Sequence, residues 1–310
     1  MTKIATLVGC AIGDALGNPF EMKPAASPLL KEWDGQFKAG GTFWKGEAGQ
    51  YTDDTLMSIA LATSLIECSG FNPEDVGQKY LAWMESGNTR GIGGTTAKAL
   101  TRLKFGATIT ESGVTHNENG TPASGNGTAM RASPIGLYYR KDLNKLLEVA
   151  MADAAITHNS HEPKMGSVAV ALGVALAANS QSNLYLPNEM LEEVHEVLAP
   201  SIVKDKLALA IAHIKNNSDP KQALAAIGAG GYVPETVGAA FYCFAKGEDF
   251  RDVVTMAIRA GGDTDTTAAV AGALAGTFYG LDEIPSEYKD NVENFQLLQD
   301  LTDELINNEI

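Results

Sequence analysis

The sequence predicts an all-α fold, built as a single domain over residues 1–310. Apolar residues recur at helical spacing in eleven segments, whereas runs that alternate like half-buried strands are nearly absent. No linker, internal repeat or low-complexity tract divides the chain, and its length suits one large domain. The expected helices cover residues 55–68, 73–85, 143–156, 164–179, 187–198, 204–215, 220–227, 234–245, 250–259, 266–278 and 288–306.

The ends of these segments carry residues that begin and end helices. Proline stands first at 73, 187, 220 and 234, and glycine or asparagine lies at or just after the ends near 85, 179, 215 and 227. Glycine-rich polar stretches interrupt the helical pattern at 13–21, 40–54, 87–96, 116–131, 157–163, 228–234 and 261–265. Because such loops hold backbone close to a ligand, functional residues are expected there.

The composition excludes several classes of function. The net charge is −15 and the isoelectric point is about 4.7, so nucleic acid and anionic membrane surfaces would be repelled. The apolar run at 165–178 is too short to span a bilayer. Three scattered cysteines without a CxxC spacing indicate a reducing, cytoplasmic environment with buried thiols. With no obvious interface, the simplest expectation is a monomer.

Two pairs of aspartates stand where an apolar helix is expected to begin. Asp263 and Asp265 occur in "RAGGDTDTT", and Asp53 and Asp54 occur in "YTDDT". Each pair alone is explained by capping, since carboxylates favour the positive end of a helix. Together with the adjacent hydroxyls they would form an oxygen-only cage, which suits two hard cations such as Mg²⁺ or Mn²⁺. The candidate ligands are Thr52, Asp53, Asp54, Asp263, Asp265 and Thr266.

A third acidic segment, "GCAIGDALGNPFE" at 9–21, places Asp14 in a helix of small residues and Glu21 after a glycine–proline turn. A carboxylate presented by such a turn can act as a general acid or base. On this segment alone, an ordinary surface glutamate is the favoured interpretation.

Six segments in this order resemble the ADP-ribosylglycohydrolase family: "GCAIGDALGNPFE", "YTDDT", "GNGTAMRASPIG", "THNSHEP", "GGYVPET" and "RAGGDTDTT". The resemblance implies an all-α fold with a binuclear Mg²⁺ or Mn²⁺ site at the bottom of a cleft. It also implies removal of ADP-ribose from modified proteins, with arginine the leading acceptor, or from small conjugates. Matched by motif, the six residues above would bind metal, and Glu21 would transfer a proton at the scissile bond.

The remaining loops suit an anionic substrate on an acidic protein. Backbone N–H groups in the stretch around 125–131 could hold a pyrophosphate, and glycines beside the metal ligands could do likewise. By resemblance, a histidine of "THNSH" contacts ligand and a tyrosine of "GGYVPET" stacks on a ring. Arg131 could equally be a buried side chain paired with an aspartate. The candidate substrate contacts are Gly93, Gly125, Asn126, Gly127, Met130, Arg131, His158, Tyr232, Gly261 and Gly262.

One loop departs from the family pattern. Many members have an aspartate before Ile-Gly in the loop that here reads "RGIGGTT", and that acid has been linked to recognition of the arginine guanidinium. This chain has Gly91 at that position. The departure weakens the expectation of an arginine acceptor more than it weakens the expectation of metal-dependent cleavage.

Three other classes of protein are alternatives for this sequence. "DTDTT" fits the D-x-D-x-T nucleophile of haloacid-dehalogenase-like phosphotransferases, but that motif follows a buried strand, and the stretch at 249–262 has helical spacing. A binding module that recognises ADP-ribose without cleaving it, or a structural protein built on the same fold, would be expected to lose a metal ligand or the glutamate. All seven residues are present here.

Overall fold

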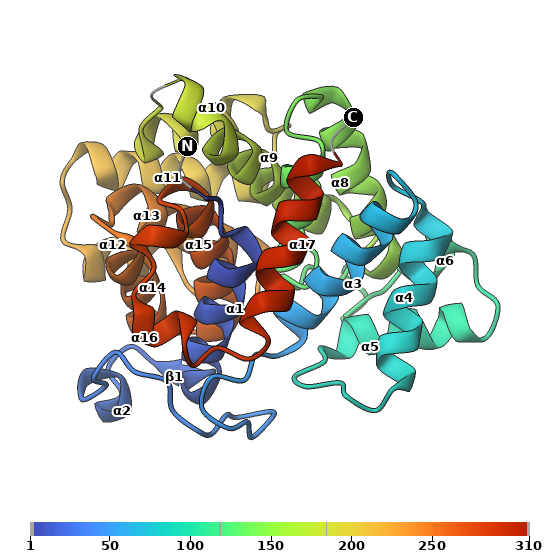
Figure 1. Ribbon diagram of the computed structural model, residues 1–310, viewed down its shortest axis with the longest axis horizontal. Helices are drawn as coiled ribbons and strands as arrows, with labels where there is room; N and C mark the ends of the chain where they lie inside the picture. Colours follow the sequence, from blue (N-terminus) through green and yellow to red (C-terminus); the bar gives the residue numbers. More distant parts are fainter. Residues whose placement is uncertain (1–2, 118, 184, 309–310) are drawn as a thin grey trace.

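A computed structural model describes residues 3–117, 119–183 and 185–308. This part of the chain forms seventeen α-helices, two short 3₁₀-helices and a pair of two-residue strands, which confirms the all-α prediction. In Figure 1, helices α4 (Pro73–Glu85), α5 (Gly94–Lys104) and α6 (Ile109–Ser112) lie on the right, and α11–α14 lie on the left. Between them stand α1 (Thr6–Gly17) and α17 (Phe295–Asn307).

The centre of the fold is the pair formed by α1 and α15 (Thr264–Phe278), both of which are almost wholly buried. Glycines allow their backbones to touch: a Cβ atom on Gly9 would lie 2.1 Å from the carbonyl oxygen of Gly272. A Cβ atom on Gly13 would lie 2.0 Å from the carbonyl oxygen of Ala268. This close approach places the end of α1 beside the beginning of α15, where the acidic segments meet.

The other helices cover this pair, and most of them match the expected segments. Those at 73–85, 220–227 and 250–259 have the predicted bounds, and seven others differ by one to four residues at an end. The remaining elements are η1 (Asn18–Phe20), α2 (Pro28–Lys31), α3 (Asp53–Glu67), α7 (Ser133–Tyr138), α8 (Leu143–Thr157), α9 (His161–Asn183), α10 (Pro187–Val197), α11 (Ile202–Lys215), α12 (Pro220–Ile227), α13 (Val233–Lys246), α14 (Phe250–Arg259), η2 (Leu281–Glu283) and α16 (Ser286–Lys289).

One predicted helix is wrong. The segment at 288–306 is not continuous, because α16 ends at Lys289 and α17 begins only at Phe295. Helix α16 ends with Asp290 as its C-cap, and Asn294, with a φ of 53°, stands in a left-handed conformation directly before α17 and redirects the chain into that helix. Helices α2, α5, α6 and α7 are not among the predicted elements, since α2, α6 and α7 are too short to show a helical period and α5 is mostly polar.

The single strand pair is the part of the fold that periodicity could not reveal. Strand β1 (Lys23–Pro24) pairs antiparallel with β2 (Gly261–Gly262), and two residues are too few to show alternation. Both glycines of β2 have a φ of 72°, and a Cβ atom on Gly262 would lie 2.1 Å from the carbonyl oxygen of Ala229. The pair ties the loop that follows Glu21 to the segment that precedes Asp263.

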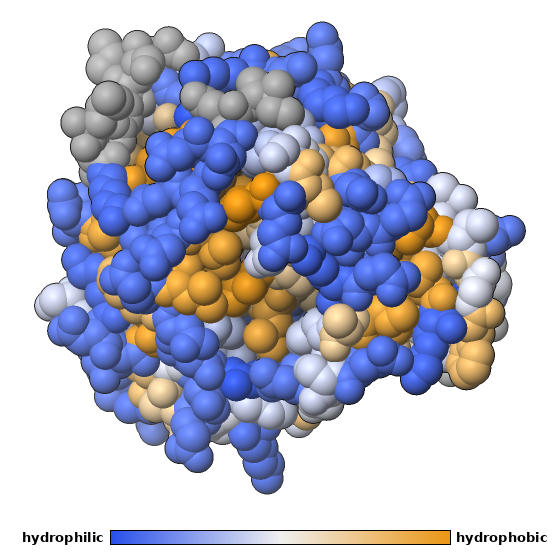
Figure 2. Space-filling view, turned by 45° about the vertical axis from the view of Figure 1, so that its right-hand side comes forward, coloured by the Kyte–Doolittle hydropathy of each residue, from blue (hydrophilic) through white to orange (hydrophobic). Residues whose placement is uncertain are grey.

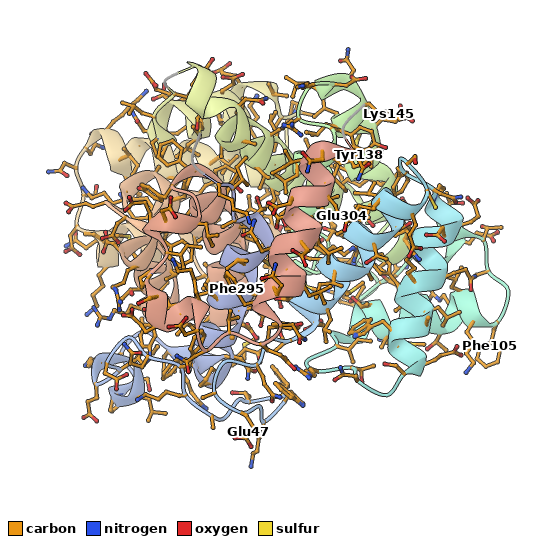
Figure 3. All side chains as sticks on the ribbon, in the orientation of Figure 1. Glu47, Phe105, Tyr138, Lys145, Phe295 and Glu304 are labelled. Atoms are coloured by element: carbon orange, nitrogen blue, oxygen red, sulfur yellow. The ribbon has the colours of Figure 1, made fainter. Side chains whose placement is uncertain are left out.

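Side-chain burial follows the usual division for a globular chain. Tyr138 is 1% exposed, whereas Phe105, at the end of α5, is 82% exposed and points away from the protein (Figure 3). Figure 2 shows a face on which polar side chains separate several apolar patches.

All three cysteines are free, but only Cys10 and Cys243 are buried; the expectation of a buried thiol is wrong for Cys68. None of the described helices combines the length and apolarity needed to cross a bilayer.

Candidate active site

The acidic side chains converge because three element ends meet. Asp53 and Asp54 open α3, Asp263 is the N-cap of α15 and Asp265 lies in its first turn, and Glu21 follows η1. The unpaired N–H groups at a helix start favour negative charge, so both helices can accept carboxylates in their first turns. None of the four aspartates is more than 8% exposed. The structure therefore brings together the two acid pairs that lie some two hundred residues apart in the sequence.

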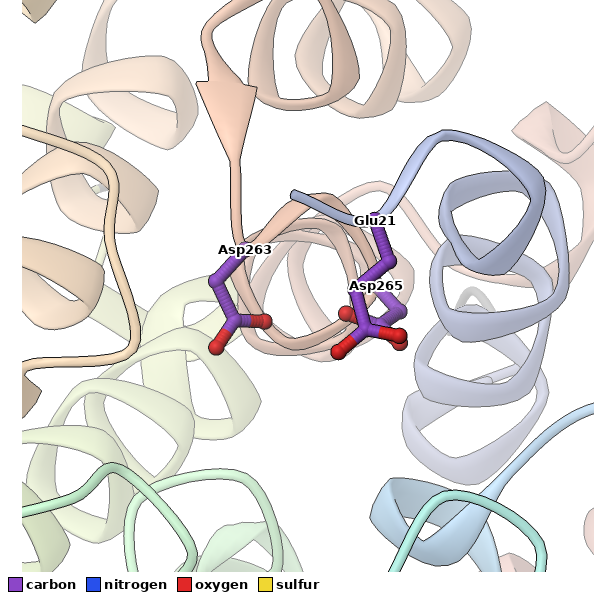
Figure 4. Close-up of side chains that lie close together, drawn as sticks. All are labelled: Glu21, Asp263 and Asp265. Atoms are coloured by element: carbon purple, nitrogen blue, oxygen red, sulfur yellow. The ribbon is translucent and has the colours of Figure 1, made fainter. Parts of the chain in front are cut away.

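Three of these carboxylates form the tightest group. Glu21, Asp263 and Asp265 each offer an oxygen, and these oxygens all lie within 4.8 Å of one another. In Figure 4 the three side chains point to the same side of the start of α15, with Glu21 and Asp265 nearly superimposed. Glu21 was expected to transfer protons, and the structure places it close enough to share a cation with the two aspartates.

Two buried oxygens at the site have no hydrogen-bond partner among the described residues: Oδ1 of Asp54 and Oδ1 of Asp263. The second oxygen of Asp263 accepts from Nδ2 of Asn126 at 2.9 Å. Buried polar atoms are rarely left unpaired, because desolvation costs about 1–3 kcal/mol for a neutral group and more for a charged one. The donor set is all oxygen, so these residues fit hard divalent cations.

The acid–base properties agree with that fit. Burial, followed by the charge of neighbouring carboxylates, raises the pKa of Glu21 to about 8. The same two causes raise the pKa of Asp53 to about 8 and raise those of Asp54 and Asp265 well above their usual range. Without a cation the cluster therefore holds protons near neutral pH, and a cation bound by the aspartates would displace protons from them.

Asp14 supports the cluster from behind and was not assigned a role from sequence. Its oxygens accept from the backbone N–H groups of Thr52, at 2.9 and 3.0 Å, and of Thr55, at 3.1 Å. They also accept from the hydroxyls of Thr52, at 2.8 Å, and Thr55, at 2.7 Å. Burial still raises its pKa to about 6. Asp14 thus fixes the first turn of α3 and orients the Thr52 hydroxyl; its place among small residues in a wholly buried helix was the available signal.

The carboxylates lie in a cavity of about 350 Å³. Twelve of the predicted site residues line it: Glu21, Asp53, Asp54, Gly93, Gly125, Asn126, Gly127, Met130, His158, Asp263, Asp265 and Thr266. Thr52 does not line it and sits beside the cluster. Residues that sequence reasoning missed also line it, namely Met22, Phe43, Gly91, Ile92, Gly94, Thr95, Thr96 and Gly231. Most of these belong to the glycine- and threonine-rich stretch that leads into and begins α5, and its composition alone does not tell which residues face a ligand.

A second cavity, of about 630 Å³, continues from the first. Thr95, Gly125 and Gly231 line both. Tyr232 lines the second cavity and is 36% exposed, so its ring is available to a ligand. A single β-bridge between Gly125 and Tyr232 joins the two loops that form this wall. The site is therefore an elongated space with the acidic cluster in its inner part.

Three predicted substrate contacts are corrected by the structure. The guanidinium of Arg131 is fully buried and forms an ion pair with Asp153. Of the two alternatives, a substrate contact or a buried pair with an aspartate, the structure therefore shows the buried pair. The partner is not one of the site aspartates. Gly261 and Gly262 line neither cavity. Their lack of a side chain instead allows the β1–β2 pairing, since a Cβ atom on Gly261 would lie 2.4 Å from the backbone nitrogen of Ala25.

The predicted pyrophosphate loop is only partly available. The N–H groups of Ala129 and Met130 donate to the carbonyl oxygen of Asn126, at 2.9 and 3.1 Å, and so are used inside a turn. Met130 can meet a ligand through its side chain alone. Gly125 and Gly127 face the cavity beside His158: a Cβ atom on Gly127 would lie 3.0 Å from Cε1 of the imidazole. These glycines keep open the space in front of the histidine.

The loop that departs from the family pattern contacts the cluster directly. Gly91 has a φ of 79°, and a Cβ atom there would lie 2.8 Å from Oδ1 of Asp53. Two residues later, the backbone N–H of Gly93 donates to the Asp53 carboxylate. Arg90 points away from the site and pairs with Glu293 at 2.5 Å. In this conformation an acidic side chain at position 91 would need a left-handed backbone and would displace the Asp53 carboxylate.

Comparison with known proteins decides the family. A family profile described as ADP-ribosylglycohydrolase matches residues 3–310. The chain belongs to the ADP-ribosylglycohydrolase family. It is 31% identical to an uncharacterized protein of Archaeoglobus fulgidus over 96% of this chain and 94% of that one. It is 28% identical to the ADP-ribosylarginine hydrolase Tri1 of Pseudomonas putida over 96% of this chain and 76% of the relative.

A solved structure gives the same answer for the fold. The chain resembles a protein described as an ADP-ribosylglycohydrolase-related protein complex, with a TM-score of 0.73 and 27% identity, over 99% of this chain and 97% of the other. Membership of the ADP-ribosylglycohydrolase family supports a hydrolase that acts on a bond between ADP-ribose and an acceptor. The haloacid-dehalogenase-like alternative is excluded, because the motif "DTDTT" follows helix α14 and the two-residue strand β2. That strand belongs to an antiparallel pair and not to a doubly wound parallel sheet, and the described residues form no such sheet.

Proposed function

We propose that this protein is a metal-dependent hydrolase that cleaves the glycosidic bond between ADP-ribose and an acceptor, with ADP-ribosyl-arginine on proteins as the leading substrate. The observation that supports this best is the pair of unpartnered, buried carboxylate oxygens of Asp54 and Asp263 inside the cavity. A reader that only bound ADP-ribose would not need this costly arrangement, and neither would a structural protein.

Two divalent cations, Mg²⁺ or Mn²⁺, would be held by the ligand set predicted from sequence: Thr52, Asp53, Asp54, Asp263, Asp265 and Thr266. When bound, they supply Lewis acidity and fix the orientation of ribose hydroxyls and water. Asp14 holds Thr52 in place, and Asn126 fixes the rotation of the Asp263 carboxylate through one of its oxygens.

Glu21 is the proposed proton-transfer group. Cleavage of the ribose–acceptor bond needs a proton delivered to the leaving group, or removed from the attacking water. Burial is the largest cause of the raised Glu21 pKa, and burial remains when cations cancel the repulsion from the aspartates. Glu21 can therefore hold its proton closer to neutral pH than an exposed glutamate would, which suits a general acid.

The ADP portion would occupy the outer cavity. Gly125 and Gly231 line its junction with the inner cavity, and the ring of Tyr232 is exposed for stacking against an aromatic base. His158 lines the inner cavity and is 2% exposed. Burial and the charge of Arg131 lower the pKa of His158 to about 3, so its imidazole is neutral and would contact a ligand oxygen by hydrogen bonding and not by charge.

The acceptor side supports a second candidate substrate. Arginine is the acceptor named for the Pseudomonas relative. Here, however, Gly91 supplies no acid for a guanidinium, and two exposed apolar side chains line the cavity: Met22, 47% exposed, and Phe43, 66% exposed. A neutral acceptor, as in an O-linked (serine-type) or a small-molecule ADP-ribose conjugate, suits this lining better than a cationic one does.

The test is release of ADP-ribose from ADP-ribosyl-arginine and ADP-ribosyl-serine peptides, each assayed with Mg²⁺, with Mn²⁺ and with EDTA. Metal-dependent release from the arginine peptide supports the leading proposal, and release from the serine peptide alone supports the second. Cleavage that persists in EDTA overturns the metal mechanism. If neither peptide is cleaved while free ADP-ribose binds, the protein is a binding module or acts on another conjugate. A single domain, a monomeric state and a cytoplasmic location stay predictions.

A further inference from the structure

We infer that Arg131 and Thr157 are positioning residues that fix the tautomer of His158, so that its Nε2–H is held toward the cavity as a hydrogen-bond donor. The contacts that fix this tautomer are buried and run from Asp153 through Arg131 and Thr157 to His158. The proposal rests on the proposed function only for the identity of the ligand, since the tautomer itself is a property of the protein.

This series of contacts begins at the Arg131 guanidinium, whose position is fixed by its hydrogen-bond partners. Nε of Arg131 donates to Oδ2 of Asp153 at 3.0 Å, and one terminal nitrogen donates to the backbone carbonyl of Asp153 at 3.0 Å. The other oxygen of Asp153 accepts from the hydroxyl of Tyr80 at 2.8 Å. The guanidinium also stacks on the Tyr80 ring, with its carbon 4.7 Å from the ring centre. Arg131 and Asp153 are both fully buried, so the direction of each N–H is determined.

The remaining terminal nitrogen of Arg131 reaches toward the cavity. Its two hydrogens are directed to the carbonyl oxygen of Gly127, at 2.8 Å, and to Oγ1 of Thr157, at 2.9 Å. Because a guanidinium has no acceptor, Thr157 must accept this hydrogen bond. The one hydrogen of the Thr157 hydroxyl is therefore left to donate elsewhere.

His158 is the partner for that hydrogen. Nδ1 of His158 lies 2.9 Å from Oγ1 of Thr157, and the described residues offer the hydroxyl no other acceptor. A hydroxyl whose oxygen accepts from a cation is polarised, which makes it a better donor. Thr157 thus donates to Nδ1, and the proton of the neutral imidazole resides on Nε2.

Nε2 is the atom that a ligand would meet. It has no hydrogen-bond partner among the described residues, and His158 lines the inner cavity. A Cβ atom on Gly125 would lie 3.4 Å from this nitrogen, so the glycine leaves the approach open. The donor suits an oxygen acceptor, either a phosphate or a hydroxyl oxygen of ADP-ribose. The same guanidinium donates to the carbonyl oxygen of Gly127, so it fixes the position of the glycine loop relative to the imidazole.

The first test needs no ligand. In ¹⁵N-labelled wild-type protein, the Nδ1 resonance of His158 should be that of an unprotonated nitrogen and the Nε2 resonance that of a protonated one. The variant Thr157→Val should give a mixture of tautomers, and Thr157→Ser should restore the wild-type pattern. A wild-type spectrum with the proton on Nδ1 overturns the inference, whether or not any variant folds and whether or not the protein is a hydrolase.

The second test measures the consequence. Thr157→Val should weaken binding of ADP-ribose, and raise KM, by about two- to fivefold, while kcat changes less than about twofold, because only a fraction of the molecules then carries the proton on Nε2. Thr302→Val is the matched control, since that hydroxyl is also fully buried and donates within its own helix to the carbonyl of Leu298. Unchanged binding in Thr157→Val overturns the positioning role. If wild-type protein does not bind ADP-ribose, the proposed function is wrong. The tautomer is then tested by the ¹⁵N spectrum alone.

Discussion

Two buried charged clusters lie close to each other in this fold and differ in how completely their polar atoms are paired. Around Arg131, the guanidinium and the Asp153 carboxylate satisfy one another and their neighbours within hydrogen-bond distance. In the acidic cluster, Asp54 and Asp263 each keep a buried oxygen without a partner among the described residues, and no cationic side chain lines the cavity.

The difference separates structure from function. A buried ion pair that is fully hydrogen-bonded needs no ligand from outside the chain, so its loss should lower the free energy of unfolding. Carboxylates that repel one another in a desolvated cavity need an external cation, so their loss should be felt in binding and catalysis while stability is kept or increased.

The largest expected effect is on catalysis. Asp263→Asn removes a charge from the tightest carboxylate group, and we expect hydrolysis to fall about a thousandfold, since Lewis-acid stabilisation is worth several kcal/mol and each 1.36 kcal/mol is a factor of ten. Metal affinity, measured by calorimetry, should fall in parallel, while the free energy of unfolding in EDTA stays equal to the wild-type value or rises.

The matched control is Asp282→Asn, which makes the same change at an exposed position outside both cavities. It should leave hydrolysis and metal affinity unchanged. If Asp263→Asn lowers the stability of the metal-free protein by more than the control does, the acidic cluster is a folding element and the contrast with the Arg131 network is lost.

The second effect is on stability. Arg131→Met leaves the Asp153 carboxylate buried without its charge partner, and we expect the free energy of unfolding, measured in urea, to fall by about 3–5 kcal/mol. Lys145→Met is the control, because Lys145 pairs with Glu148 on the surface, where such pairs contribute about 0–1 kcal/mol. A loss for Arg131→Met no larger than that of the control would show that the buried pair does not stabilise the fold.

The same contrast explains what the sequence could predict. Helical periodicity and terminal prolines located most helices, because those signals are local and each helix buries one face. The metal ligands were also recognisable, since each acid pair stands at a helix start. Asp14 could not be given its role, because its partners Thr52 and Thr55 lie some forty residues away and only packing brings them together.

Arg131 is a second residue whose role the sequence could not decide. Its motif lies next to the ligand loop, so sequence alone allowed either a substrate contact or a buried pair. Its partner Asp153 carries no motif and sits in the middle of α8, where nothing distinguishes it from a surface aspartate. The β1–β2 pair is too short to leave a periodic signal, although it connects Glu21 to Asp263. In each case the missing information is a long-range contact.

The third prediction concerns pH and metal removal. Folded-state pKa values of about 8 for Glu21 and Asp53 lie above those of the unfolded chain, so the metal-free folded protein binds more protons than the unfolded one. This contribution to stability is fully present below pH 4 and is lost as pH rises through about 8. In EDTA, the unfolding midpoint in urea should therefore fall over this range.

Adding Mg²⁺ or Mn²⁺ at pH 7 should restore stability and release protons, which calorimetry in buffers of different ionisation enthalpy would detect. The Asp263→Asn variant should show a smaller pH dependence and release fewer protons. Stability that does not change with pH in EDTA, or metal binding without proton release, would mean that the carboxylates are already ionised and compensated from within the chain.

The smallest effect tests how tightly the acidic cluster is confined. Gly91 and Gly87 both have a φ of 79°, but a Cβ atom on Gly91 would lie 2.8 Å from Oδ1 of Asp53, whereas a Cβ atom on Gly87 would meet nothing within 4 Å. Alanine at either position should cost about 1 kcal/mol of stability for the left-handed backbone. Only Gly91→Ala should also displace Asp53 and weaken metal binding, by about three- to tenfold. Equal metal affinity in the two variants would show that the loop can move away from the cluster, and the same freedom would then allow an acidic side chain at position 91 to reach an arginine acceptor.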